Sequence, residues 1–188
     1  MDRRDFLVIS SSSMLVCNSP LLFATEGWGD TKSLITHSKI TTNTGLSRRQ
    51  WKTIVAVQDH LFPSEENAPG ARDVNAKAFF YAVLSDAGRD GEDRKLIKEG
   101  LLILQDICWK KHKQTFIELK HDAKEDTLRE FENTANGTAW IMTVLGYIFE
   151  ALLTDPVYGG NPDGTGWKWL DHQPGFPRPT EDKRYFLL

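Results

Sequence analysis

The chain has 188 residues, which is enough for one domain with a substantial core. Hydrophobic residues make up 40% of it and charged residues 26%, as is ordinary for a soluble globular protein. Its formal net charge of -3 lacks the basic footprint of nucleic-acid-binding proteins, so we expect no nucleic-acid partner.

The first 24 residues have the features of an export signal. The segment begins with the arginine pair Arg3 and Arg4. Phe6 and Leu7 follow, and a moderately apolar, serine-rich run then extends to Ala24. This order resembles the twin-arginine signals of proteins that cross a membrane already folded. It implies the twin-arginine translocase as a partner, and a location in the periplasm or on the outer face of the cytoplasmic membrane. The alternative is an amphipathic or merely apolar first helix.

A flexible linker is predicted for residues 25–45, which are rich in threonine, serine and glycine and have no sustained period. From residue 46 to residue 172, apolar residues recur at helical spacing in several segments. No long stretch alternates strictly between polar and apolar residues, as a half-buried strand would. The sequence therefore predicts an all-α fold, a single bundle of about five helices.

The first four helices can be placed from their caps and apolar stripes. Ser47 is predicted to cap a first helix that ends before Pro63, and Asp73 to cap a second. A third helical region runs from about residue 92 to 119, and a short, mostly charged fourth helix from about 123 to 133.

The fifth helix is predicted to lie at the centre of the bundle. The run from Ala139 to Leu153 is nearly uncharged and is interrupted only by Glu150. A helix that is apolar on nearly all sides must be surrounded by other parts of the protein. It is also too short for a confident membrane span. Asp155 and Pro156 are expected to end it, because proline cannot continue a helix.

Residues 158–169, YGGNPDGTGWKW, form what we call the Gly/aromatic-rich loop. Four glycines, a proline and three large aromatic residues predict tight turns that hold aromatic rings. Two interpretations stay open: the loop closes over the end of its own helix, or it is a docking surface for another protein. Several prolines then predict an extended tail over residues 173–188, whose apolar end folds back onto the bundle or lies along a partner.

The sequence predicts no catalytic, cofactor-binding or metal-binding residue. The five histidines lack the spacing of a metal site, and residues 164–166 lack the third glycine and the flanking elements of a dinucleotide site. Outside the signal, Cys108 is the only cysteine. It cannot form an internal disulfide there, and we expect burial rather than a bridge to a partner.

The run from Asp155 to Trp167, DPVYGGNPDGTGW, carries a resemblance when it follows such an apolar helix. It resembles the C-terminal signature of the gluconate 2-dehydrogenase subunit 3 family, the small subunits of exported flavin-dependent sugar and sugar-acid dehydrogenases. The resemblance is best over residues 152–167 and looser from about residue 46 onward. It implies a noncatalytic subunit that binds a large flavoprotein subunit, supports its maturation and supplies its export signal. FAD would belong to that partner, and a cytochrome c subunit would often complete the complex.

The residues expected next to the partner belong to the Gly/aromatic-rich loop: Tyr158, Gly159, Gly160, Asn161 and Trp167. One alternative is a free-standing interaction protein of the cell envelope that has no dehydrogenase partner. Another is a periplasmic enzyme acting alone, which would need a convergent set of titratable residues that the sequence does not show. The resemblance implies that substrate specificity would reside in the large subunit.

Overall fold

The computed structural model describes residues 44–86 and 91–183. The export-signal residues Arg3, Arg4, Phe6 and Leu7 lie outside the described residues, as do most of the linker and the apolar end of the tail. The described ranges contain α-helices and short 3-10 helices but no β-strand, which confirms the predicted all-α fold. No helix within these ranges has both the length and the apolar character needed to cross a membrane.

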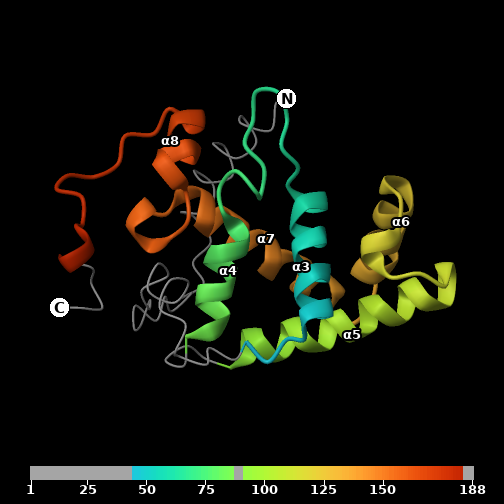
Figure 1. Cartoon of the computed structure of the whole chain (residues 1–188). Helices are drawn as coiled ribbons and strands as arrows, with labels where there is room; N and C mark the ends of the chain where they lie inside the picture. Colours follow the sequence, from blue (N-terminus) through green and yellow to red (C-terminus); the bar gives the residue numbers. More distant parts are fainter. Residues whose placement is uncertain (1–43, 87–90, 184–188) are drawn as a thin grey trace.

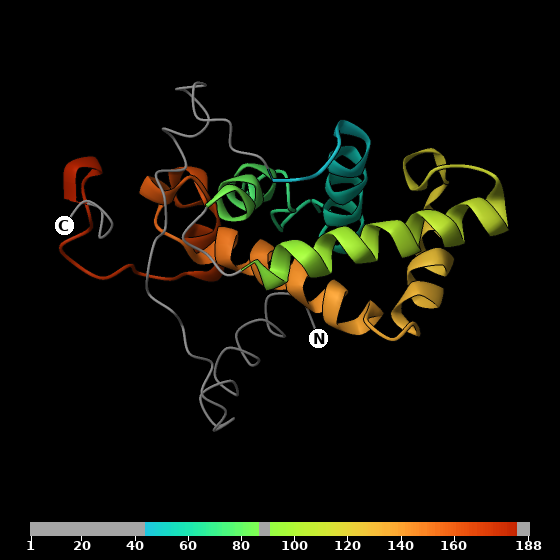
Figure 2. The same cartoon turned by 90° about the horizontal axis from the view of Figure 1, so that it is seen from below.

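The described part has six α-helices: α3 (Arg48–Leu61), α4 (Ala76–Ser85), α5 (Glu92–His112), α6 (His121–Glu132), α7 (Gly137–Leu153) and α8 (Thr165–Leu170). The 3-10 helices are η2 (Phe116–Glu118), η3 (Pro156–Tyr158), η4 (Pro162–Gly164) and η5 (Glu181–Lys183). Helix α7 runs through the middle of the molecule and packs against each of the other five α-helices (Figure 1). Helix α5 lies lengthwise beside it, with α6 near one end of the pair and α8 near the other (Figure 2).

Helix α3 begins where the sequence predicts. The hydroxyl of Ser47 accepts a hydrogen bond from the Gln50 amide at 3.3 Å, and the Gln50 side chain accepts one from the Ser47 amide at 2.9 Å. This reciprocal capping box satisfies two amides that have no partner inside the helix. The helix ends at Leu61, just ahead of Pro63.

The predicted cap of the second helix is wrong. The residue before α4 is Asn75, which has a left-handed φ of 55°. Asp73 holds the preceding turn instead, because its carboxylate accepts hydrogen bonds from the Gly70 amide at 2.7 Å and from the Ser64 hydroxyl. These two bonds lower the pKa of Asp73. Asn tolerates the left-handed conformation better than most residues, so the chain turns there.

The third helical region is shorter than predicted. Helix α5 ends at His112, because Lys113 takes a left-handed φ of 55° while its amide still bonds to the carbonyl of Trp109 at 3.1 Å. After this turn, residues 116–118 form η2, which buries Phe116 in the core. The apolar pattern continues past Lys113, and periodicity alone does not detect a left-handed residue, so the helix was predicted to continue.

The core forms where α5 and α7 meet. Trp140 of α7 is fully buried, and its indole donates a hydrogen bond to the carbonyl of Ile97 at 3.1 Å. The ring lies against Gly100 of α5, where an added Cβ would fall 2.1 Å from a ring carbon. Cys108 is also fully buried, as expected, and burial raises the pKa of its thiol to about 11. The close approach of α5 and α7 therefore depends on a residue without a side chain.

Helix α7 is not surrounded on all sides, contrary to the prediction. Met142 is 57% exposed and Leu153 48% exposed. Gly146 lies on the same side, and an added Cβ there would meet no atom within 4 Å. The five packed helices cover one broad face of α7 and leave an apolar one open.

Two alanine substitutions in helices should have opposite effects. Gly100→Ala should lower the free energy of unfolding by about 1 to 3 kcal/mol, because the new methyl group overlaps the Trp140 ring. Gly146→Ala should raise it by about 0.5 to 1 kcal/mol, because the helix gains propensity at an open position. Urea denaturation of both variants tests this. A stabilising Gly100→Ala would contradict the packing described for Gly100, and a destabilising Gly146→Ala would contradict the open position of Gly146.

Candidate functional site

The Gly/aromatic-rich loop folds into short helices at the end of α7. The sequence predicts only turns here, but residues 165–170 form α8, which carries both tryptophans of the loop. Asp155 starts η3, because its carboxylate accepts a hydrogen bond from the Val157 amide at 3.0 Å. Left-handed residues at Asn161 and Gly164 separate the short helices, and such breaks hide the helical period in the sequence.

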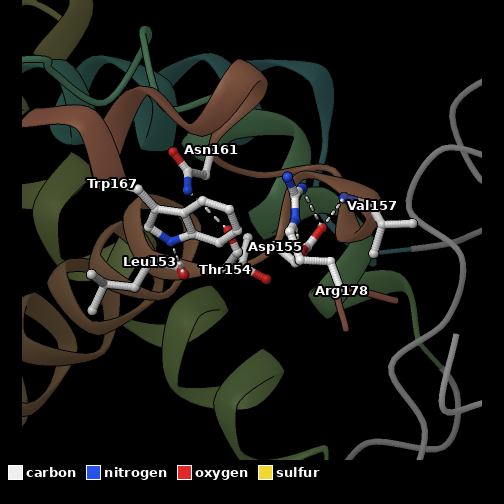
Figure 3. Close-up of polar contacts among 7 residues, drawn as sticks. All are labelled: Leu153, Thr154, Asp155, Val157, Asn161, Trp167 and Arg178. Carbon is white, nitrogen blue, oxygen red and sulfur yellow. Dashed lines mark hydrogen bonds and ion pairs between the residues drawn. The ribbon is translucent and has the colours of Figure 1, made fainter. Parts of the chain in front are cut away.

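The loop satisfies the free carbonyl groups at the end of α7. The indole of Trp167 donates a hydrogen bond to the carbonyl of Leu153 at 2.8 Å (Figure 3). The side-chain amide of Asn161 donates to the carbonyl of Thr154 at 3.0 Å. Both side chains are buried: Trp167 is 8% exposed and Asn161 is fully buried. The last carbonyls of a helix have no partner within it, so these bonds cap α7 from outside.

Two glycines let the loop approach the end of α7 closely. An added Cβ at Gly160 would lie 2.7 Å from the carbonyl oxygen of Ala151. One at Gly166 would lie 2.2 Å from the carbonyl oxygen of Leu152. The Gly166 amide also donates a hydrogen bond to the Asn161 side chain at 2.7 Å. Any larger residue would push the loop away from the helix.

The loop is also tied to the turn that precedes α4. The amide of Asn161 donates a hydrogen bond to the carbonyl of Val74 at 3.0 Å. In the opposite direction, the side chain of Asn75 donates to the carbonyl of Gly159 at 2.8 Å. The left-handed conformation of Asn75 therefore also serves the loop. Nothing in its sequence neighbourhood points to a contact 84 residues away.

The tail returns to the loop through an arginine. The guanidinium of Arg178 donates hydrogen bonds of 2.8 and 3.2 Å to the two carboxylate oxygens of Asp155 (Figure 3). It also lies over the Trp167 ring, 5.0 Å from its centroid. Burial raises the pKa of Asp155, but hydrogen bonds from Arg178 and from the Val157 amide outweigh this effect, so the pKa lies below its ordinary value. Sequence spacing gave no signal for this pair.

The five residues predicted to lie next to a partner are brought together in this loop, but they do not share one exposed surface. Gly160, Asn161 and Trp167 are buried against α7, while Tyr158 and Gly159 are partly exposed. The geometry therefore favours the interpretation in which the loop closes over the end of its own helix. Direct contact of Tyr158 and Gly159 with a partner stays a prediction.

A shallow hollow of about 370 Å³ lies beside the loop, between α8 and the tail. Trp167, Lys168, His172 and Arg178 contribute to its lining. The charged side chains of its lining are of both signs. Over residues 44–86 and 91–183, no three His, Cys, Asp or Glu side chains lie close enough together to hold a metal ion.

Asn161→Ala should lower the free energy of unfolding by about 2 to 4 kcal/mol. The change leaves the part-buried Thr154 carbonyl and the buried Gly166 amide without their Asn161 partners, and each such loss costs about 1 to 3 kcal/mol. Alanine also fits the left-handed backbone of residue 161 poorly. Urea denaturation measures the effect. Asp163→Asn is the matched control, because residue 163 is also left-handed but is exposed, and it should shift stability little.

Arg178→Ala should lower stability by about 1 kcal/mol near neutral pH, since Arg178 is 48% exposed and solvent screens its ion pair. The depressed pKa of Asp155 stabilises the folded state above the unfolded pKa, and this contribution is lost as the pH falls through the folded pKa. The difference in free energy of unfolding between the unaltered protein and the Arg178→Ala variant should therefore narrow below about pH 4. Urea titrations across this range test it, and a constant difference would contradict the role of Asp155.

Comparison with known proteins places these features in a family. No curated protein and no solved structure matches this chain significantly. The sequence profile described as gluconate 2-dehydrogenase subunit 3 matches residues 48–175, from the start of α3 to beyond α8 and the Gly/aromatic-rich loop. This match spans more than half of the chain and confirms the resemblance carried by the loop, so the protein belongs to the gluconate 2-dehydrogenase subunit 3 family and is related to a dehydrogenase subunit.

Proposed function

We propose that this protein is the noncatalytic small subunit of an exported FAD-dependent dehydrogenase that acts on sugars, sugar acids or alcohols. It binds the large flavoprotein subunit, which carries FAD and performs the chemistry. The match to a dehydrogenase subunit family over residues 48–175 carries this proposal. A cytochrome c subunit would be a further member of the complex and would take electrons from the flavin.

The structure of the loop is consistent with a binding role for the whole domain. The loop is fixed to α7, to the turn before α4 and to the tail by hydrogen bonds. A surface held in this way loses little conformational freedom when it binds, so less free energy is spent on ordering it. Residues that are buried in the loop would then act on the partner indirectly, by holding the exposed surface in place.

The export part of the proposal rests on residues outside the described ranges. Arg3, Arg4, Phe6 and Leu7 would direct the chain to the twin-arginine translocase. That route carries folded proteins, so a single signal would take the flavoprotein across with its bound FAD. The complex would then act in the periplasm or on the outer face of the cytoplasmic membrane.

The proposal predicts a stable complex with a flavoprotein. A C-terminally tagged protein, isolated gently from the envelope of its own host, should bring a large polypeptide in equal amount, with flavin absorption. Replacing both Arg3 and Arg4 by lysine should keep the complex but leave it in the cytoplasm. A tagged protein that emerges alone and colourless would refute the subunit role and favour a free-standing interaction protein of the envelope.

A further inference from the structure

The exposed side of α7 bears a continuous apolar strip. We call it the α7 strip: Ala139, Met142, Gly146, Phe149 and Leu153, at successive steps of three, four, three and four residues. This spacing places all five on one side of the helix. Met142 and Leu153 are 57% and 48% exposed, Ala139 is exposed, and Phe149 and Gly146 are half-buried.

The α7 strip differs from the outer faces of the other helices. Each of the other five described α-helices exposes at least one charged side chain: Arg48 in α3, Lys77 in α4, Asp106 in α5, Asp122 in α6 and Lys168 in α8. Apolar residues are exposed on α5 as well. There, however, Asp106 and Lys110 lie between Leu102 and the end of the helix, and they form an ion pair in which Nζ and Oδ2 are 2.6 Å apart. The exposed positions of α7 carry no charge, and the one charged residue of this helix, Glu150, is half-buried. A solvated helix face is normally charged, so the α7 strip has the chemistry of a covered surface.

We propose that the α7 strip docks against an uncharged, apolar face of the large flavoprotein subunit. This inference rests on the proposed function and adds the place of contact. A charged face on the partner would lose its water without gaining an ion pair here, whereas an apolar face gains from leaving water. The space over Gly146, where an added Cβ meets nothing within 4 Å, leaves room for a partner side chain in the middle of the strip.

The position of the strip favours the large subunit over a second copy of this chain. At one end the strip reaches Leu153, which lies next to the Gly/aromatic-rich loop, because its carbonyl accepts a hydrogen bond from the indole of Trp167. A large partner can cover both and include the partly exposed Tyr158. A second copy paired strip to strip would bury mainly Met142 and Leu153, the large exposed side chains of the strip. These two side chains fall short of the roughly 800 Å² that a stable interface buries on each partner.

Charge substitutions on two helices test the inference. In the full-length tagged protein isolated from its host, Met142→Asp with Leu153→Asp should weaken flavoprotein binding by about thirtyfold. Leu102→Asp is the matched control, because Leu102 is 60% exposed on α5, and it should change binding less than about twofold. All these positions are exposed, so the variant subunits should keep the helicity and melting temperature of the parent.

Gly146→Leu separates docking from folding. Leucine favours a helix more than glycine does, and its Cβ meets nothing within 4 Å at this position, so the free subunit should melt at a higher temperature. The same side chain fills the space over the strip and should reduce flavoprotein binding by at least about tenfold.

Other outcomes would overturn the inference. Unchanged flavoprotein binding by the α7 variants would do so, and a loss caused by Leu102→Asp would move the contact to α5. Light scattering that reveals a dimer broken by Met142→Asp would assign the strip to a second copy. If removal of residues 1–43 makes the α7 strip more accessible to solvent, that segment, and not the flavoprotein, would be what covers the strip. If the unaltered protein brings no flavoprotein at all, it is the proposed function that fails.

Discussion

The structure depends on how the last carbonyl groups of α7 find hydrogen-bond partners. This helix is the one against which every other described α-helix packs, and the carbonyls at its end, those of Leu153 and Thr154, have no partner within the helix. Trp167 and Asn161 supply the missing donors. Glycine at positions 160 and 166 is the steric condition for this approach. The need to satisfy the carbonyls at the end of α7 thus explains the sequence DPVYGGNPDGTGW without reference to a partner.

The two sides of α7 have different roles. Its buried side holds the bundle together, through Trp140 against α5 and through the short hydrogen bond from Tyr147 to Asp93. On its outer side, the exposed Met142 and Leu153 are uncharged, while Phe149 still packs against Phe62 of the core. Residues that stabilise the bundle and residues available to a partner are therefore separated on one helix. A subunit built this way can change its binding surface without losing its core.

Much of the fold follows from local sequence, and the rest depends on distant contacts. The cap at Ser47 and the apolar run of α7 are local, so the sequence predicts them. Left-handed residues such as Lys113 and Asn75 interrupt helices without changing the apolar pattern, and the predicted end of α5 and cap of α4 were wrong for that reason. In the candidate site, the composition of the loop predicts tight turns around aromatic rings. It does not predict α8, nor the bond between Arg178 and Asp155, which are 23 residues apart.

The bonds from Asn75 to Gly159 and from Asn161 to Val74 have a consequence for the order of folding. They join parts of the chain separated by 84 or more residues, and such distant contacts form late, because a long loop must close first. On a ribosome, α3 and α4 emerge well before the residues that hold the turn between them in place. The domain is therefore completed only when nearly the whole chain has been synthesised. A chain that stopped short of residue 160 would lack Asn161 and α8, and with them the contacts that bind the end of α7 and the turn before α4.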